Sequence, residues 1–146
     1  MKILLLIPKI HSTISPRKAF SSSLQGVTVE QMEKAGDLVK SICQPKFKIS
    51  DETAANFRKG ILADDKDAKC YINCIFENMQ AMKRGKFQWE ATKKQAEIML
   101  PDDVKEATLA ACEACKTVTD GVKDPCEAAY GLLQCLKTNS KNFFFP

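Results

Sequence analysis

The sequence of 146 residues is almost without histidine, and its one example, His11, lies in the first 25 residues, which we set aside from the fold. The rest of the chain therefore has no histidine for an acid–base pair or a nucleophilic dyad. Long apolar runs are also lacking, since none reaches the roughly 18 residues that a membrane span needs. No segment shows sustained strand alternation, and there is no internal repeat. These absences argue against an enzyme, a membrane-spanning chain and a sheet or repeat fold.

The body of the chain also lacks excess charge. The formal net charge is +4, but Lys2, Lys9, Arg17 and Lys18 are the only charged residues before Glu30. Leaving these four out of the 22 basic residues gives 18, against 18 acidic residues. No basic stripe remains for nucleic acid or an anionic membrane surface. We therefore expect no nucleic-acid partner.

Cysteine, by contrast, is abundant, with seven residues in a short chain. Small cysteine-rich chains are mostly secreted and disulfide-linked. The N-terminus starts like a secretory signal, but its apolar run from Ile3 stops at Pro8 and is shorter than the usual range of about 7–15 residues. The Ser-rich stretch 12–23 has some features of a transit peptide. Because of the cysteines, we interpret residues 1–25 as an atypical secretory leader and residues 26–146 as one domain.

Apolar residues recur at helical spacing in six segments, and capping residues mark several of the starts. Thr28 and Gln31 fit a capping box, and Ser50 precedes a second helix. Pro101 and Pro125 stand where helices favour proline, in the first turn. The pattern predicts an all-α domain with helices at about residues 28–43, 50–59, 68–84, 90–100, 101–120 and 124–138.

The third of these helices is predicted to be central. Cys70 and Cys74 are four residues apart, so they share one face and can each bond to a different neighbouring helix. Its apolar arc is too wide for a surface helix and comprises Ala68, Tyr71, Ile72, Ile75, Phe76, Met79 and Met82.

The cysteine spacing is Cys43-x26-Cys70-x3-Cys74-x40-Cys115-x10-Cys126-x8-Cys135, with Cys112 left over. Six cysteines allow 15 pairings, so spacing alone does not decide between them. The spacing resembles that of the insect odorant-binding proteins, the pheromone- and general-odorant-binding family, over residues 27 to 146. The run from Cys43 to Lys48, the context Glu113-Ala114-Cys115 and the aromatic tail ending in Pro146 resemble the same family.

The resemblance implies about six helices around an apolar cavity, held by three interlocked disulfides, Cys43–Cys74, Cys70–Cys126 and Cys115–Cys135. It implies a secreted extracellular carrier of odorants or pheromones, in a fluid like sensillum lymph if the protein is chemosensory. The implied partners are a small hydrophobic ligand and an odorant receptor, and a homodimer is compatible with the family. Neither a cofactor nor a metal is expected.

Cys112 departs from the family pattern. Cys112-x13-Cys126 leaves open that Cys112 replaces Cys115 in the framework, although the Glu113-Ala114-Cys115 context favours Cys115. Otherwise Cys112 is a buried small hydrophobe, an intermolecular partner or a reactive thiol. The Cys112-to-Cys115 spacing matches a redox motif, but it lies inside a helix without a βαβ unit. A zinc site from these two and the Cys70/Cys74 pair is disfavoured by secretion and spacing.

A carrier needs a closed apolar pocket with few polar groups. No Ser or Thr lies between Cys74 and Met82, so that wall favours a mostly apolar ligand. Each predicted wall residue is equally a candidate for plain core. The predicted ligand-binding residues are Phe57, Ile61, Leu62, Ile72, Ile75, Phe76, Met79, Met82, Trp89, Met99, Leu132, Leu133, Phe143, Phe144 and Phe145.

The last three of these form an unbroken run of phenylalanine before Pro146. If the three rings were exposed, each would lose about 1.5–3 kcal/mol of the free energy that burial provides, and together they would promote aggregation. We expect them to dock as a lid or wall of the cavity, the alternative being a frayed terminus. If the tail is exposed and the core is filled, the sequence instead favours a secreted interaction protein acting on a protein or membrane partner.

Overall fold

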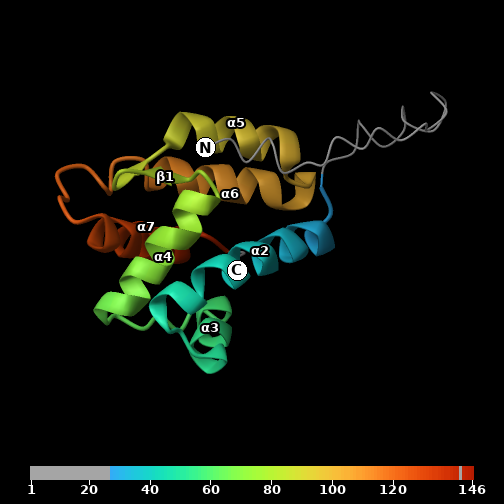
Figure 1. Ribbon diagram of the computed structural model, residues 1–146. Coiled ribbons are helices and arrows are strands. Elements are labelled where there is room, and N and C mark those ends of the chain that lie inside the picture. Colours follow the sequence, from blue (N-terminus) through green and yellow to red (C-terminus); the bar gives the residue numbers. More distant parts are fainter. Residues whose placement is uncertain (1–26, 142) are drawn as a thin grey trace, which may run out of the picture.

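The computed structural model of the protein describes residues 27–141 and 143–146, so the predicted leader lies outside these ranges. Within them the chain forms six α-helices, a 3-10 turn and one short hairpin (Figure 1). The prediction of an all-α fold with six helices is confirmed. The elements are α2 (Val29–Cys43), η2 (Pro45–Phe47), α3 (Asp51–Arg58), α4 (Lys66–Asn78), β1 (Met82–Lys83), β2 (Lys86–Phe87), α5 (Trp89–Met99), α6 (Asp102–Ala114) and α7 (Pro125–Asn139).

Side-chain caps define most of the helix starts. Thr28 and Gln31 form the predicted capping box of α2, with both reciprocal hydrogen bonds present. The Ser50 hydroxyl accepts from the Thr53 N–H at the start of α3, and the Asp124 carboxylate accepts from the N–H groups of Cys126 and Glu127 in the first turn of α7. These caps occupy N–H groups that the first turn of a helix leaves unpaired, which is why these residues could be found from the sequence.

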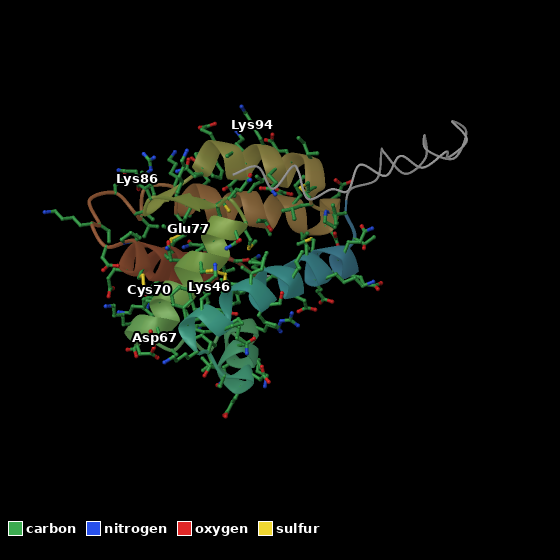
Figure 2. All side chains as sticks on the ribbon, in the orientation of Figure 1. Lys46, Asp67, Cys70, Glu77, Lys86 and Lys94 are labelled. Atoms are coloured by element: carbon green, nitrogen blue, oxygen red, sulfur yellow. A yellow bond between two sulfur atoms is a disulfide. The ribbon has the colours of Figure 1, made fainter. Side chains whose placement is uncertain are left out.

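Helix α4 is central, as predicted, and packs most extensively against α7. Its buried side chains include Tyr71, Ile72 and Ile75, each fully inaccessible to solvent. Charged side chains such as Lys86 and Lys94 project outward (Figure 2). No helix in the described part of the chain is both long and apolar enough to cross a bilayer.

The predicted end of this helix near Gly85 was wrong. Helix α4 ends at Asn78, and Gln80 has a left-handed φ of 59°. The chain then forms the β1–β2 hairpin, whose two turn residues, Arg84 and Gly85, have φ values of 51° and 76°. Positive φ at both positions is the geometry of a type I′ turn. The glycine therefore closes a hairpin rather than a helix.

The predicted end of the fifth helix, near Gly121, was also too late. Helix α6 ends at Ala114, and tighter turns follow it up to Gly121. Cys115 lies just past the helix and is bonded to Cys135 of α7. In the same stretch the buried Thr119 hydroxyl accepts from the Phe87 N–H at 3.1 Å. These turns thereby join the hairpin to the end of α6.

Three disulfides connect the helices, with the pairing that the family resemblance implies. Cys43–Cys74 joins α2 to α4, Cys70–Cys126 joins α4 to α7, and Cys115–Cys135 joins the end of α6 to α7. The side chain of Cys70 is labelled in Figure 2. Cys70 and Cys74 reach different helices, as expected from their shared face, so α4 is linked covalently to both α2 and α7.

Candidate ligand-binding site

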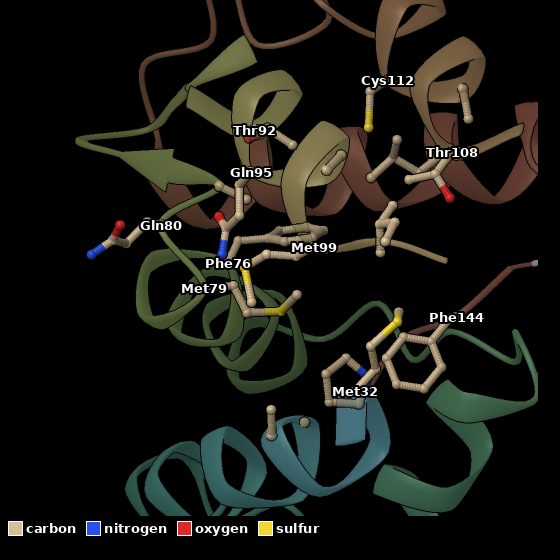
Figure 3. A pocket seen from close by; sticks show the side chains of 18 of the residues that line it. Met32, Phe76, Met79, Gln80, Thr92, Gln95, Met99, Thr108, Cys112 and Phe144 are labelled. Carbon is tan, nitrogen blue, oxygen red and sulfur yellow. The ribbon is translucent and has the colours of Figure 1, made fainter. Parts of the chain in front are cut away.

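A cavity of about 410 Å³ lies between α2, the end of α4, α5, α6, α7 and the C-terminal tail (Figure 3). This volume falls in the range of about 300–1,000 Å³ that is typical of small-molecule sites. Its wall is mainly apolar, and among residues 27–141 and 143–146 no side chain that lines it belongs to Asp, Glu, Lys, Arg or His. Such a site binds a ligand by removing apolar surface of the ligand and of the wall from water, and not by pairing with a charge.

Six of the predicted ligand-binding residues line this cavity. They come from four regions of the chain, and they are Phe76, Met79, Met99, Leu132, Phe143 and Phe144. In Figure 3, Phe76 and Met79 lie beside Gln95, while Met32 lies beside Phe144. The end of α4 and the C-terminal tail are thus brought to the same cavity.

The structure places the other nine elsewhere. Phe57, Ile72, Ile75, Met82, Leu133 and Phe145 are buried in the packed core. Leu62 and Trp89 are partly buried against that core, and Ile61 is 59% exposed. Ile61 follows Gly60, whose positive φ turns the chain at the end of α3. In α4 the earlier turns face packed side chains, so only the last turn reaches the cavity.

Much of the wall comes from residues outside the predicted set, many of them small. Helix α2 forms one side of the cavity wall, and α6 contributes to another side through Ala111 and Cys112. Their helical periodicity was visible in the sequence, but it does not distinguish a cavity wall from core. The additional apolar, glycine and proline residues and the thiol are Val27, Met32, Ala35, Gly36, Val39, Ala81, Phe87, Ala96, Leu100, Ala111, Cys112, Leu136 and Pro146.

Six neutral polar residues also reach the cavity: Asn78, Gln80, Thr92, Gln95, Thr108 and Ser140. The hydroxyl-bearing ones come from α5, α6 and the end of α7, not from the α4 wall that the sequence argument addressed. The Asn78 amide is engaged, since it donates to the Cys74 carbonyl at 2.9 Å. The remaining polar groups are sparse, as expected for a site that orients a mostly apolar ligand.

Cys112 is a free thiol in the cavity wall and is 5% exposed. Burial raises its pKa to about 11, so the thiol is neutral near pH 7 and behaves as a small apolar group. Cys115 is bonded to Cys135, so Cys112 and Cys115 do not form the dithiol that a redox motif requires. Within residues 27–141 and 143–146, no three His, Cys, Asp or Glu side chains are grouped so as to hold a metal ion.

The C-terminal tail closes one side of the cavity. Phe143, Phe144 and Pro146 line it, whereas Phe145 turns into the core and is 1% exposed. Pro146 rests on Gly36 of α2, where a built Cβ would lie 3.0 Å from the proline Cβ and 3.2 Å from its Cγ. Glycine at this position therefore lets the end of the chain sit against α2.

This contact predicts different effects for two glycines inside helices. Gly131→Ala in α7 meets nothing within 4 Å and should gain the usual stabilisation of about 0.5–1 kcal/mol. Gly36→Ala should lose this gain, because the added methyl group displaces Pro146. We therefore expect the free energy of unfolding of Gly36→Ala to be about 1–2 kcal/mol lower than that of Gly131→Ala. Urea unfolding of both variants measures the difference. Equal gains would show that the tail does not rest on Gly36.

Comparison with known proteins identifies the family. A sequence profile described as the PBP/GOBP family matches residues 25–139, which is most of the chain. The chain belongs to this family. General odorant-binding protein 72 of Anopheles gambiae is similar to this PBP/GOBP chain, with 48% identity over 82% of the chain and 99% of that protein. General odorant-binding protein 19a of Drosophila melanogaster is 46% identical, over the full length of both.

Solved structures of odorant-binding proteins share the fold of this PBP/GOBP chain. Odorant binding protein 4 of Chrysopa pallens superposes with a TM-score of 0.74 at 39% identity, covering 82% of the chain and 99% of that structure. Odorant binding protein 5 of Apis mellifera superposes equally well, with a TM-score of 0.74 at 29% identity over 84% and 100%. The family resemblance drawn from the cysteines is confirmed. The family consists of carriers of small hydrophobic molecules rather than enzymes, and the carrier function extends to this chain.

Proposed function

We propose that this PBP/GOBP chain holds one small, mostly apolar molecule in the cavity beneath its C-terminal tail. The supporting observation is that a largely apolar wall, in which no described side chain is charged, is completed by the C-terminal tail. Apolar burial of about 25 cal/mol per Å² drives binding, and the few polar groups orient the ligand. Because Met32, Met79 and Met99 contribute flexible side chains, the site adapts to ligands of differing shape.

We further propose that the protein acts in extracellular fluid and delivers odorants or pheromones to a membrane receptor. Three disulfides suit an oxidising compartment. Residues 1–25 would then be the secretory leader, and N-terminal sequencing of the secreted protein tests this boundary.

Homodimerisation is a separate proposal, tested by sedimentation velocity. The interaction-protein alternative relied on an exposed tail, and the burial of Phe145 argues against it.

A fluorescence titration with the apolar probe N-phenyl-1-naphthylamine tests the carrier proposal. The oxidised chain should bind the probe saturably, with micromolar affinity. Ala111→Phe should weaken binding about tenfold, because its ring fills the cavity that Ala111 lines. Ala110→Phe is the matched control, since Ala110 is the exposed neighbour on α6 and does not line the cavity. Absence of saturable binding, or equal losses in both variants, would contradict the proposal.

A further inference from the structure

Three methionines, Met32, Met79 and Met99, line the cavity, and two of them are also exposed to solvent. Met79 caps the end of α4 and is 38% exposed, and Met99 is the last residue of α5 and is 41% exposed (Figure 3). Gln80 and Gln95, which also line the cavity, are exposed as well. Met79 and Met99 therefore border an opening of the cavity to solvent.

A thioether at such an opening is accessible to hydrogen peroxide and to organic hydroperoxides. The sulfur lone pair attacks one peroxide oxygen and the O–O bond breaks. The proton on the transferred oxygen passes to the departing oxygen, which leaves as water or as an alcohol. The sulfur is oxidised by two electrons to a sulfoxide, and the peroxide is reduced by two.

The other sulfur atoms in the described part of the chain are better protected. Six cysteines are already paired in disulfides. Cys112 is 5% exposed, and because burial raises its pKa to about 11 it offers almost no thiolate to a peroxide. Met82 is 2% exposed in the packed core, and Met32 is partly buried. A hydroperoxide therefore reaches Met79 and Met99 first.

A sulfoxide changes what the wall presents to an apolar ligand. Its oxygen is a hydrogen-bond acceptor, and an apolar ligand has no donor for it. If the modified side chain stays against the ligand, this oxygen loses its water without gaining a partner. If it turns outward to water, the ligand loses an apolar contact with the wall. In both cases the affinity for the ligand falls.

We propose that Met79 and Met99 form a modification site at the opening of the cavity, where oxidation to sulfoxides by hydroperoxides lowers the affinity for apolar ligands. This inference rests on the carrier function proposed above and adds a chemical control of the same site. Methionine sulfoxide reductases restore the thioether, one enzyme for each sulfoxide epimer, so the loss of affinity is reversible.

Hydrogen peroxide treatment of the disulfide-bonded chain at neutral pH, followed by peptide mass spectrometry, tests the selectivity. Met79 and Met99 should each gain one oxygen at least about tenfold faster than Met82. The treated protein should bind N-phenyl-1-naphthylamine about tenfold more weakly, and the two classes of sulfoxide reductase together should restore the affinity.

Two results would overturn the inference and leave the carrier proposal standing. One is oxidation of Met82 as fast as that of Met79 and Met99. The other is unchanged probe affinity in protein that carries both sulfoxides. If the untreated protein does not bind the probe, the carrier proposal fails and the inference fails with it.

Leucine variants show which methionines are responsible. Met79→Leu/Met99→Leu replaces both thioethers with side chains of similar volume, which packed sites tolerate. Because both residues line the cavity, each variant is compared with itself before peroxide treatment. Peroxide should weaken probe binding to this variant by less than about twofold. The matched control Met82→Leu changes a core residue outside the cavity wall, so its loss should remain about tenfold. An equal loss in both variants would overturn the inference.

Discussion

Phe145→Ala is expected to lower the free energy of unfolding by about 3–5 kcal/mol, the usual range for removing a fully buried phenylalanine. The ring is 1% exposed and lies at the centre of an aromatic cluster. Its centroid is 5.8 Å from both Phe57 and Phe76, and 6.5 Å from Tyr71. Truncation therefore removes apolar burial and three ring contacts, and it leaves a cavity in packed core.

Phe144→Ala is the matched control, one residue away on the same tail. Its ring is 41% exposed, so the loss should stay near 1 kcal/mol. Urea unfolding can be followed through Trp89, the only tryptophan, which lies 6.3 Å from the Phe87 ring. Similar losses for the two variants would show that the tail is not anchored through Phe145. The same pair also separates the two roles of the tail, because Phe144 lines the cavity and Phe145 does not.

Removal of the Cys70–Cys126 disulfide is expected to have a comparably large effect. The bond closes a loop with a sequence separation of 56, for which the chain-entropy relation gives about 4 kcal/mol. It also joins α4 to α7, the most extensively packed pair of helices. The double variant Cys70→Ala/Cys126→Ala avoids unpaired thiols and should lose about 3–4 kcal/mol in denaturant unfolding.

The Cys115–Cys135 bond is the internal comparison, with a separation of 20 and an expected loss of about 3 kcal/mol. The corresponding double alanine variant should therefore be the more stable of the two. A loss below 1 kcal/mol for Cys70→Ala/Cys126→Ala would mean that packing alone holds α4 against α7. The reverse order of the two variants would contradict loop entropy as the main contribution.

Errors in the helix boundaries have local causes. Lys83-Arg84-Gly85 looked like a helix end, because basic residues and glycine favour that position. The same residues serve a type I′ turn, and the two-residue spacing between Lys83 and Lys86 was the available signal for a hairpin. The late end assigned to α6 has a different cause. Cys115 belongs to a disulfide just beyond the helix, and apolar spacing continued past it into the turns.

The cavity wall was harder to predict than the helices. Ile72 and Phe76 belong to one apolar arc on α4, yet Ile72 is buried in core and Phe76 also reaches the cavity. Apolar periodicity marks both as turned away from water and does not show what fills the space beyond them. Small residues such as Gly36 and Ala111 were passed over, because a list built on large side chains omits those that create room.

The sequence by itself determined the all-α class, the starts of the capped helices α2, α3 and α7 and, through its cysteine spacing, the family, whereas the Asp65 cap of α4 was assigned to a loop. Those features depend on local periodicity, on caps that satisfy N–H groups within three residues, and on a cysteine count that points to disulfides. Only the tertiary structure decided which apolar residues face the cavity, that Phe145 enters the core while Phe143 and Phe144 stay at the wall, and that Cys112 is left free. These outcomes depend on how helices distant in the sequence pack together, and a cavity is the space that their side chains leave unfilled.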